Sequence, residues 1–364
     1  MNGKPLIVVA MSGGVDSSAA AAMLVEQGYP VAGMMLRLWS EPGSEFDNKC
    51  CTPDAMGQAR KVAGQLGIPF YAIDAREKFR GEVVEAFING YRSGETPNPC
   101  MVCNRVVRWG FLLDHAIHLG AAAMATGHYA RVERAADGQY QLLRGIDPNK
   151  DQSYVLSGLN QEQLSMSLFP LGTLTKPEVR AYAERLKLTS AQRPDSQDLC
   201  FLGNEDYRVF LSRYSPEVAK PGPIVLTNGE VIGEHQGLAF YTIGQRKGLG
   251  VANAEPLYVL GKDVHQNRLV VGLGSELGSY SLTAGQVNWI SGIAPTASFE
   301  AEVKIRYKAR PVLAHISPLG TDQFVASFSE PLRDITPGQI AVIYIGDRVV
   351  GSGKIQMESS KRED

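Results

Sequence analysis

The residues best suited to chemistry lie in a short run of serines and glycines, residues 12–18. Its two glycines let the backbone come close to a ligand, and the hydroxyl groups of Ser12, Ser17 and Ser18 add hydrogen-bond donors. The run lies between an apolar stretch and an alanine-rich stretch, so it would join a strand to a helix. Backbone N–H groups and the helix dipole can hold phosphate oxygens at such a junction. The plainer interpretation is a glycine turn capped by serine.

This loop differs from a Walker A loop because it has no Gly-Lys-Ser or Gly-Lys-Thr ending. A loop without that lysine is better suited to holding the pyrophosphate part of ATP than to passing on the γ-phosphate. The sequence therefore predicts a site that uses ATP to activate a substrate. The loop by itself leaves that substrate open among amides, acids and bases.

Five cysteines are a second source of chemistry, and all of them lie in the first 200 residues. We expect no secretory signal, so an odd number of cysteines indicates reduced thiols for chemistry or metal, not a disulfide scaffold. Cys100 and Cys103 form a Cys-x-x-Cys motif, which suits a redox pair or half of a metal site. Cys50 and Cys51 fit an inert role as well as a redox or metal role. Zinc or an iron–sulfur cluster is a minority hypothesis.

The composition is that of a globular chain of two or three domains, with 364 residues, 44% of them hydrophobic and 20% charged. The net charge of -2 argues against a uniformly basic nucleic-acid surface, so any RNA contact must rest on local patches. No apolar run approaches the roughly 18 to 20 residues that span a bilayer. We therefore expect a cytoplasmic protein without a membrane segment.

The first half of the chain alternates strand-like and helix-like segments. The expected strands are residues 6–11, 31–38, 68–73 and 122–126, and the expected helices are residues 17–27, 54–66 and 106–119. Such alternation implies a parallel sheet with helices on both faces and ligands at the carboxyl ends of the strands. The predicted fold class is α/β, with an N-terminal Rossmann-like domain over residues 1–200.

The second half is β-rich, with short strand-like runs separated by Gly, Pro and Asn. Asn228 and Gly229 form a hairpin signal between two such runs. Further runs are residues 269–273, 300–307, 323–328 and 340–345. We expect a small central domain over residues 201–278 and a C-terminal β-barrel over residues 279–357.

One of these runs carries a basic stripe. Apolar residues alternate with Lys304, Arg306, Lys308 and Arg310, so a strand here would present four cations on one face. Such a face could bind the phosphates of RNA. The ordinary alternative is a solvated charged surface.

The loop at 12–18 resembles that of the PP-loop ATP pyrophosphatases, which adenylate an oxygen and let a nucleophile displace AMP. Several further stretches are similar, in the same order and over nearly the whole chain, to the tRNA-specific 2-thiouridylases. These stretches are Gly-Gly-Val-Asp-Ser (13–17), Thr-Pro-Asn-Pro-Cys-Met-Val-Cys-Asn (96–104), Thr-Gly-His-Tyr (126–129), Asn-Lys-Asp-Gln-Ser-Tyr (149–154), Asp-Leu-Cys-Phe (198–201), Gly-Glu-His-Gln-Gly (233–237) and Gly-Gln-Arg-Lys-Gly-Leu-Gly (244–250).

The resemblance implies ATP-dependent conversion of the wobble uridine of tRNA to 2-thiouridine, with release of AMP and pyrophosphate. It implies Cys200 as the persulfide carrier and Cys103 as its partner, with ATP and Mg²⁺ as cofactors. A cysteine desulfurase or a relay protein would supply sulfur, and the substrates would be the Lys, Glu and Gln tRNAs. Other members often carry aspartate where Cys100 stands, and this departure raises the weight of a metal site.

The resemblance also implies two sets of binding residues. The ATP-binding set is Ala10, Met11, Ser12, Gly13, Gly14, Val15, Asp16, Ser17, Leu36 and Gly127. The tRNA-binding set is Asn98, Pro99, Cys100, His128, Lys150, Asp151, Gln152, Arg306, Tyr307 and Gln339. Two alternatives stay open: another PP-loop adenylating synthetase that uses ammonia, and a non-catalytic tRNA-binding protein that senses ATP.

Overall fold

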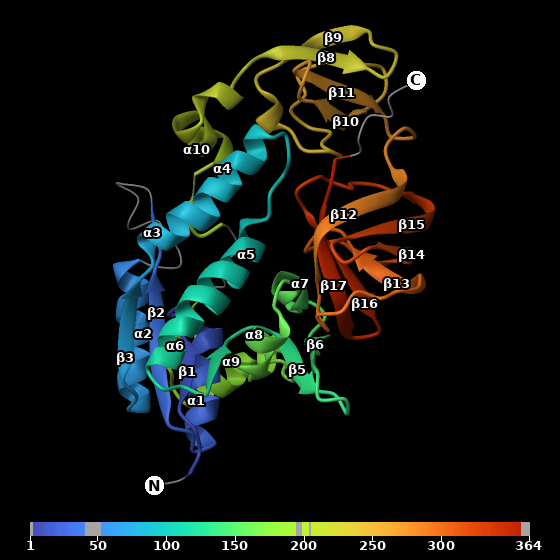
Figure 1. The fold of residues 1–364 in the computed structure, drawn as a ribbon. Coiled ribbons are helices and arrows are strands. Elements are labelled where there is room, and N and C mark those ends of the chain that lie inside the picture. The colour runs from blue at the N-terminus through green and yellow to red at the C-terminus, as the bar shows by residue number, and fades with distance from the viewer. Residues whose placement is uncertain (1–2, 41–51, 194–198, 204, 358–364) are drawn as a thin grey trace.

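The computed structural model describes residues 3–40, 52–193, 199–203 and 205–357. Figure 1 shows an N-terminal α/β body, a small sheet within residues 222–273 and a barrel within residues 279–355. Cys50 and Cys51 lie outside the described residues, as does the C-terminal segment 358–364.

The N-terminal body contains a parallel sheet with the strand order β3-β2-β1-β4-β7. Its central strand β1 (Ile7–Ala10) pairs in parallel with β2 (Val31–Arg37) on one side and with β4 (Ala123–Thr126) on the other. The outer strands are β3 (Phe70–Asp74) and β7 (Ser167–Leu168). The predicted parallel sheet is thus confirmed.

Helices cover both faces of this sheet, because alternate residues of a strand point to opposite sides. Ile7 and Val9 pack in one core with α1 (Val15–Glu26) and α2 (Pro53–Leu66). Val8 packs in another core with a layer of helices on the opposite face. That layer consists of α3 (Arg76–Phe79), η1 (Arg80–Val84), α4 (Glu85–Arg92), α5 (Pro99–Val102), η2 (Cys103–Leu112) and α6 (Leu113–His118).

Local signals set the ends of the helices that flank the site. Thr52 caps the start of α2, and Gly67 ends that helix in the left-handed conformation, with a φ of 65°. Helix α9 (Lys176–Arg185) begins with a capping box of Thr175 and Glu178. Within the described ranges, no helix is both long enough and apolar enough to cross a membrane.

The small sheet contains the predicted hairpin. Strands β8 (Gly222–Leu226) and β9 (Val231–His235) pair antiparallel around Asn228 and Gly229. β8 also pairs in parallel with β11, so the strand order is β10-β11-β8-β9. The remaining elements of this part are α10 (Tyr207–Tyr214), η3 (Pro216–Val218), η4 (Leu238–Phe240), β10 (Leu257–Asp263) and β11 (Arg268–Leu273).

The C-terminal strands form the predicted barrel. Strand β12 pairs with both β15 and β17, which closes the sheet around a core that includes Phe324, Ala326 and Ile343. The strands are β12 (Ser279–Trp289), β13 (Phe299–Lys304), β14 (Val312–Leu319), β15 (Gln323–Leu332), β16 (Ile340–Ile345) and β17 (Arg348–Ile355).

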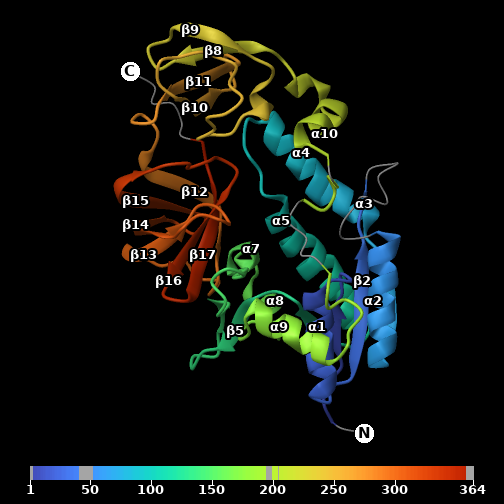
Figure 2. The same cartoon turned by 180° about the vertical axis from the view of Figure 1, so that it is seen from behind.

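A hairpin of the N-terminal body joins the barrel sheet, which the sequence did not predict. Strands β5 (Ala130–Arg134) and β6 (Tyr140–Arg144) pair with each other, and Leu143 of β6 pairs with Arg348 of β17. Both Figure 1 and Figure 2 show β5 and the barrel side by side. The short helices that follow the hairpin are α7 (Ser153–Leu156) and α8 (Gln161–Ser165).

The predicted basic strand face over residues 304–310 is wrong. Strand β13 ends at Lys304, and the Ala309 N–H donates to the Arg306 carbonyl at 3.1 Å, which closes a turn. Pro311 follows closely and has no N–H with which to continue a strand ladder. The four cations therefore do not share one strand face.

Candidate active site

A cavity of about 530 Å³ opens at the carboxyl ends of β1, β2 and β4. The chain leaves β1 for β2 and β3 on one side, whereas β4 lies on the other side. Ligands of open α/β sheets bind at such a switch point. The lining contains Ala10, Met11, Ser12, Gly14, Val15, Asp16, Ser17, Leu36 and Gly127 of the predicted ATP set, and His128, Lys150, Gln152 and Tyr307 of the predicted tRNA set. Residues of both sets therefore meet in one cavity.

Hydrogen bonds within residues 12–18 hold the shape of the glycine loop. Ser17 Oγ accepts a hydrogen bond from the Ser12 N–H at 3.1 Å, and Ser18 Oγ donates to the Gly14 carbonyl at 2.8 Å. Gly13 has a φ of +73°, and a Cβ there would collide with a backbone oxygen of α2. Because α1 begins directly after the loop, its free N–H groups and its dipole can bind phosphate at the cavity.

Gly127 packs directly against this loop. A Cβ at Gly127 would lie 2.6 Å from the Ser17 nitrogen and 2.7 Å from the Asp16 carbonyl carbon. The resemblance places Gly127 in the ATP-binding set. The structure shows that it leaves room for the backbone of the loop itself.

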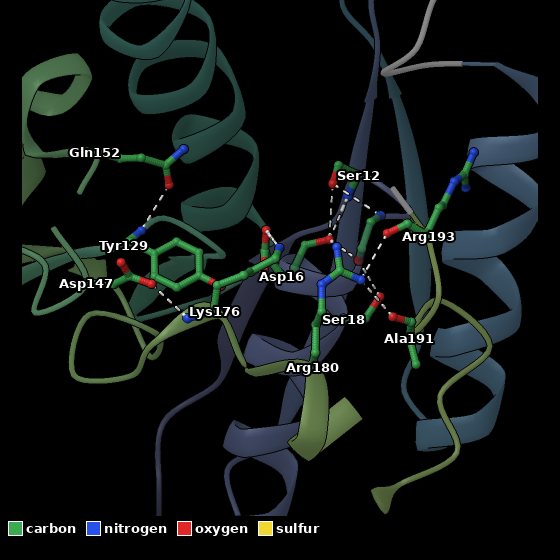
Figure 3. A network of polar contacts seen from close by, with 12 residues as sticks. Ser12, Asp16, Ser18, Tyr129, Asp147, Gln152, Lys176, Arg180, Ala191 and Arg193 are labelled. Atoms are coloured by element: carbon green, nitrogen blue, oxygen red, sulfur yellow. Dashed lines mark hydrogen bonds and ion pairs between the residues drawn. The ribbon is translucent and has the colours of Figure 1, made fainter. Parts of the chain in front are cut away.

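Asp16 is the acidic residue of the cavity lining, and two side chains from distant segments contact its carboxylate (Figure 3). Lys176 Nζ lies 2.7 Å and 2.8 Å from the two carboxylate oxygens, and the Tyr129 hydroxyl donates to Oδ1 at 2.8 Å. The sequence predicted neither contact. Tyr129 belongs to the motif at 126–129, but nothing near Lys176 in the sequence indicates a partner 160 residues away.

Arg193 also contacts the loop region. Its guanidinium donates to the Gly13 carbonyl at 3.3 Å and forms an ion pair with Asp54 at 2.7 Å. Arg193 lines the cavity and directly precedes the segment 194–198, which lies outside the described residues. Arg193, seven residues before Cys200 in the sequence, is therefore bonded to the loop at 12–18.

His128 is buried, with its ring between Arg108 and Thr126. Nη1 of Arg108 lies 3.2 Å from His128 Nε2, and the Thr126 hydroxyl lies 2.7 Å from Nδ1. A guanidinium can only donate, so Nε2 accepts and the proton sits on Nδ1. Burial, and then the charge of Arg108, lower the pKa of His128 to about 3. The side chain is therefore a neutral imidazole at the edge of the cavity.

The turn that carries Lys150, Asp151 and Gln152 is held by its own side chains. Asp151 Oδ1 accepts hydrogen bonds from the backbone N–H groups of Gly145 and Ser153, at 3.1 Å and 3.0 Å. Gln152 Oε1 accepts from the Tyr129 N–H at 3.0 Å. Asp151 and Gln152 thus shape the turn. Lys150 lines the cavity, and so does Gln152.

The segment 96–100, which contains three residues of the predicted tRNA set, lies against the barrel. Pro99 begins helix α5, Asn98 forms a side-chain hydrogen bond with Tyr154, and Cys100 is exposed. Burial raises the pKa of Tyr307 to about 12, and the nearby groups of Asp151 and Cys100 contribute in the same direction. Tyr307 of the barrel is therefore a neighbour of Cys100.

The other two barrel residues of the predicted tRNA set make internal contacts. The Arg306 guanidinium donates to the Ile243 carbonyl at 3.2 Å and to the Thr336 hydroxyl, and burial lowers its pKa. Gln339 Nε2 donates to the Thr96 carbonyl at 2.8 Å, two residues before Asn98. These side chains connect the barrel to the central part and to segment 96–100.

The two predicted catalytic cysteines pack in the same large hydrophobic cluster, which extends from the N-terminal body into the barrel. Cys103 is buried at the start of η2, and Cys200 is partly buried and packs against the same hydrophobic cluster. Phe201 anchors the turn that carries Cys200, because its ring packs edge-on against Phe87 at a centroid distance of 5.2 Å.

The metal hypothesis involved five cysteines, of which the structure describes Cys100, Cys103 and Cys200. Among the described residues, no group of three or more His, Cys, Asp and Glu side chains is placed to hold a metal ion. The predicted participation of Cys50 and Cys51 falls outside the described residues.

Three sequence families match successive parts of the chain. Residues 5–204 match the tRNA methyl transferase HUP domain. Residues 208–273 match the tRNA methyl transferase PRC-barrel domain, and residues 279–355 match the aminomethyltransferase beta-barrel domain.

Curated proteins are similar over almost the whole chain. The tRNA-specific 2-thiouridylase MnmA of Heliobacterium modesticaldum is 50% identical over 356 residues, which cover 97% of this chain and 92% of that protein. This chain belongs to the tRNA-specific 2-thiouridylase family. Its relatives of the same name in Geotalea uraniireducens and Carboxydothermus hydrogenoformans are 46% and 45% identical, over 98% and 97% of this chain and 96% and 98% of theirs. The resemblance drawn from the motifs is confirmed. Two of the matching domain families are named after a tRNA methyl transferase, whereas these full-length relatives are named as 2-thiouridylases.

Proposed function

We propose that this chain is an ATP-dependent tRNA 2-thiouridylase that replaces the C2 oxygen of the wobble uridine with sulfur. The observation that carries the proposal is the shared cavity, in which Ser12 and Ser17 of the ATP loop face the same space as Lys150 and Tyr307. A nucleotide and an RNA base brought to one cavity can react with each other. The relatives at 45% to 50% identity support tRNA as the substrate.

In the first step, the uridine C2 oxygen attacks the α-phosphorus of ATP, and the bond from that phosphorus to the bridging oxygen breaks. Pyrophosphate leaves, and the base carries AMP on its former carbonyl oxygen. The loop at 12–18 and the N-terminus of α1 would hold the pyrophosphate, because they line the cavity and the first N–H groups of a helix have no partner within the helix. Adenylation makes the oxygen a good leaving group.

In the second step, sulfur replaces AMP at C2. A persulfide on Cys200 attacks C2 through its outer sulfur, and AMP leaves with the oxygen. The Cys103 thiolate then attacks the inner sulfur of Cys200, which releases the thiolated base and leaves a disulfide between Cys103 and Cys200. A cellular reductant must restore both thiols. Both cysteines pack in the same hydrophobic cluster, and this supports the pairing.

The RNA would enter between the N-terminal body and the barrel. Lys150 and Lys308 line the cavity and can approach phosphates, while Asn98 and Pro99 would form a rigid wall for the base beside Tyr154. Arg306 and Gln339 would act mainly by holding the barrel in place, because they already bond to Ile243 and Thr96.

The cofactors and partners follow from this chemistry. Mg²⁺ would arrive with ATP and be held mainly by its phosphates, because Asp16 is the only carboxylate in the described cavity lining and it is paired with Lys176. A cysteine desulfurase or a relay protein would deliver the persulfide. We place the reaction in the cytoplasm and take the Lys, Glu and Gln tRNAs as substrates. We assign residues 1–200 to the catalytic domain, residues 201–278 to the central domain and residues 279–357 to the barrel domain.

The proposal is tested by incubating the protein with unmodified tRNA, ATP and a persulfide donor. Mass spectrometry of the tRNA nucleosides should show 2-thiouridine, with pyrophosphate released in equal amount. Pyrophosphate without 2-thiouridine would favour another adenylating synthetase. The absence of both products would favour a binding protein that only senses ATP, and either result would refute the proposal.

A further inference from the structure

Two residues reach the Asp16 carboxylate from segments that are far apart in sequence. Tyr129 follows strand β4 and is buried, and Lys176 is the first residue of helix α9. Figure 3 shows both side chains converging on Asp16 at the start of α1. The Lys176 side chain is only 9% exposed and that of Asp16 is 32% exposed, so this ion pair is far less screened than a surface pair.

The backbones of the same two residues bond to the turn at 147–152. The Tyr129 N–H donates to Gln152 Oε1 at 3.0 Å, and the Tyr129 carbonyl accepts from the Gln152 N–H at 2.9 Å. The Lys176 N–H donates to Asp147 Oδ2 at 2.9 Å. Asp147 is buried, and its carbonyl accepts the N–H groups of Lys150 and Asp151.

Tyr129 and Lys176 therefore form two parallel bridges of the same design. In each bridge, the backbone of the residue bonds to the turn that carries Lys150, and its side chain bonds to the Asp16 carboxylate at the start of α1. A movement of the turn must be transmitted to Asp16 or break one of these bonds. The bonds are short, and Tyr129, Lys176 and Asp147 are buried, so breaking one of the bonds has a cost comparable to that of an unsatisfied buried group.

We propose that Lys176 and Tyr129 are positioning residues that couple the ATP loop to the RNA-binding turn. RNA that contacts Lys150 would fix the turn, the two bridges would fix Asp16, and the loop would then hold ATP in the reactive position. This inference rests on the proposed function only in taking RNA as the ligand of the turn. Coupling of this kind is reciprocal, so ATP must change the affinity for tRNA by the same factor.

The test measures the binding of an ATP analogue that cannot be cleaved between its α- and β-phosphates, by calorimetry, with and without unmodified tRNA. We expect tRNA to tighten analogue binding about fivefold or more in the unaltered protein, a typical allosteric coupling. Lys176→Met removes the ammonium and keeps both the stem and the backbone bond to Asp147. We expect it to bring the ratio of the two affinities close to one.

Two further variants distinguish coupling from damage to the fold. Tyr129→Phe keeps the ring and both backbone bonds and removes only the hydroxyl, so it should reduce the ratio partially. Lys176→Arg keeps the charge and should retain most of the ratio. Lys61→Met, on the exposed face of α2, is the matched control and should bind like the unaltered protein.

A ratio of one in the unaltered protein, or an unchanged ratio in Lys176→Met, would overturn the coupling. Formation of 2-thiouridine by the unaltered protein is measured in parallel. Coupling can therefore fail while thiolation stands, and the two failures are separate observations.

Discussion

The two sides of the cavity are built differently. On the ATP side, residues 12–18 bond mainly to one another, as in the contacts between Ser12 and Ser17. On the RNA side, the barrel residues that the family resemblance implicates bond to segments far away: Arg306 bonds to Ile243 and Gln339 bonds to Thr96. The internal shape of residues 12–18 is therefore set by local sequence, although Gly13 and Asp16 also receive bonds from distant residues. The barrel residues depend on how the parts of the chain pack together.

This difference implies that substitutions on the two sides fail in different ways. A change in residues 12–18 should affect ATP binding while the barrel stays in place. A change at Arg306 or Gln339 should disturb the relative position of the barrel and segment 96–100. The variants below separate the two sides, and the expected effects decrease from one to the next.

Cys200→Ser leaves both sides of the cavity intact and removes the proposed sulfur carrier. We expect the loss of 2-thiouridine to exceed about a thousandfold, because no other group replaces a missing nucleophile. Release of pyrophosphate in the presence of tRNA should persist for at least one turnover. Nucleoside mass spectrometry and a pyrophosphate assay measure the two steps, and 2-thiouridine at the unaltered level would remove Cys200 from the mechanism.

Gly13→Ala breaks the ATP side alone. A left-handed residue with a side chain costs about 1–2 kcal/mol, and here the new Cβ also meets a backbone oxygen of α2. We expect ATP binding at least about tenfold weaker and tRNA binding in the absence of ATP unchanged. Gly57→Ala, on α2 with open space around it, is the control. Equal ATP affinity in the two variants would show that the loop does not hold the nucleotide.

Gln339→Ala breaks the RNA side alone. It removes the hydrogen bond to the Thr96 carbonyl, which contributes about 0.5–1.5 kcal/mol. The KM for tRNA should rise about two- to tenfold, with little change in the KM for ATP. Gln266→Ala, on an exposed turn of the small sheet, is the control. A larger effect on ATP than on tRNA would contradict the division into two sides.

His128 lies between the two sides, and its protonation state should change least when the pH is lowered. Its lowered pKa, about 3, means that burial disfavours the charged form. The ring should therefore stay neutral, with its proton on Nδ1, as the pH falls from 8 to 5. Histidine-selective NMR measures this, with His128→Gln to assign the signal. A titration midpoint near the ordinary value of about 6.5 would show that the ring is open to solvent.

Acidification should also lower the free energy of unfolding, because the pKa of His128 is lower in the folded state than in the unfolded state. Below the pKa of the unfolded state the unfolded chain binds the proton and the folded chain does not. Stability is therefore lost as the pH falls below about 6.5, by at most about 1.4 kcal/mol per pH unit from this one group.

Local patterns predicted most of the fold and the ATP side of the site. The glycine loop, the alternating strands and helices, and the hairpin at Asn228 and Gly229 depend on neighbours in sequence, and the structure contains each of them. The predicted strand over residues 300–307 is confirmed up to Lys304, where β13 ends, and is wrong beyond it, where the chain turns and Arg306 bonds to two distant segments. Period-two alternation alone carries no information about such contacts.

The contacts on Asp16 could not be predicted for the same reason. Lys176 lies 160 residues from Asp16, and its neighbours in sequence indicate only the start of a helix. The family resemblance supplied candidate roles for Asp151 and Gln152, but it did not show that their side chains already shape the turn. Predicting a contact of this type requires the packing of α9 against α1.

The central claim is that ATP activates the C2 oxygen of the uridine itself. The most direct test uses tRNA that carries oxygen-18 at C2 of the wobble uridine, with mass spectrometry of the AMP that is released. The account predicts that AMP gains one oxygen-18 atom for each 2-thiouridine formed, because that oxygen leaves with AMP. Unlabelled AMP accompanied by 2-thiouridine would contradict the account, since ATP would then be cleaved without bonding to the base.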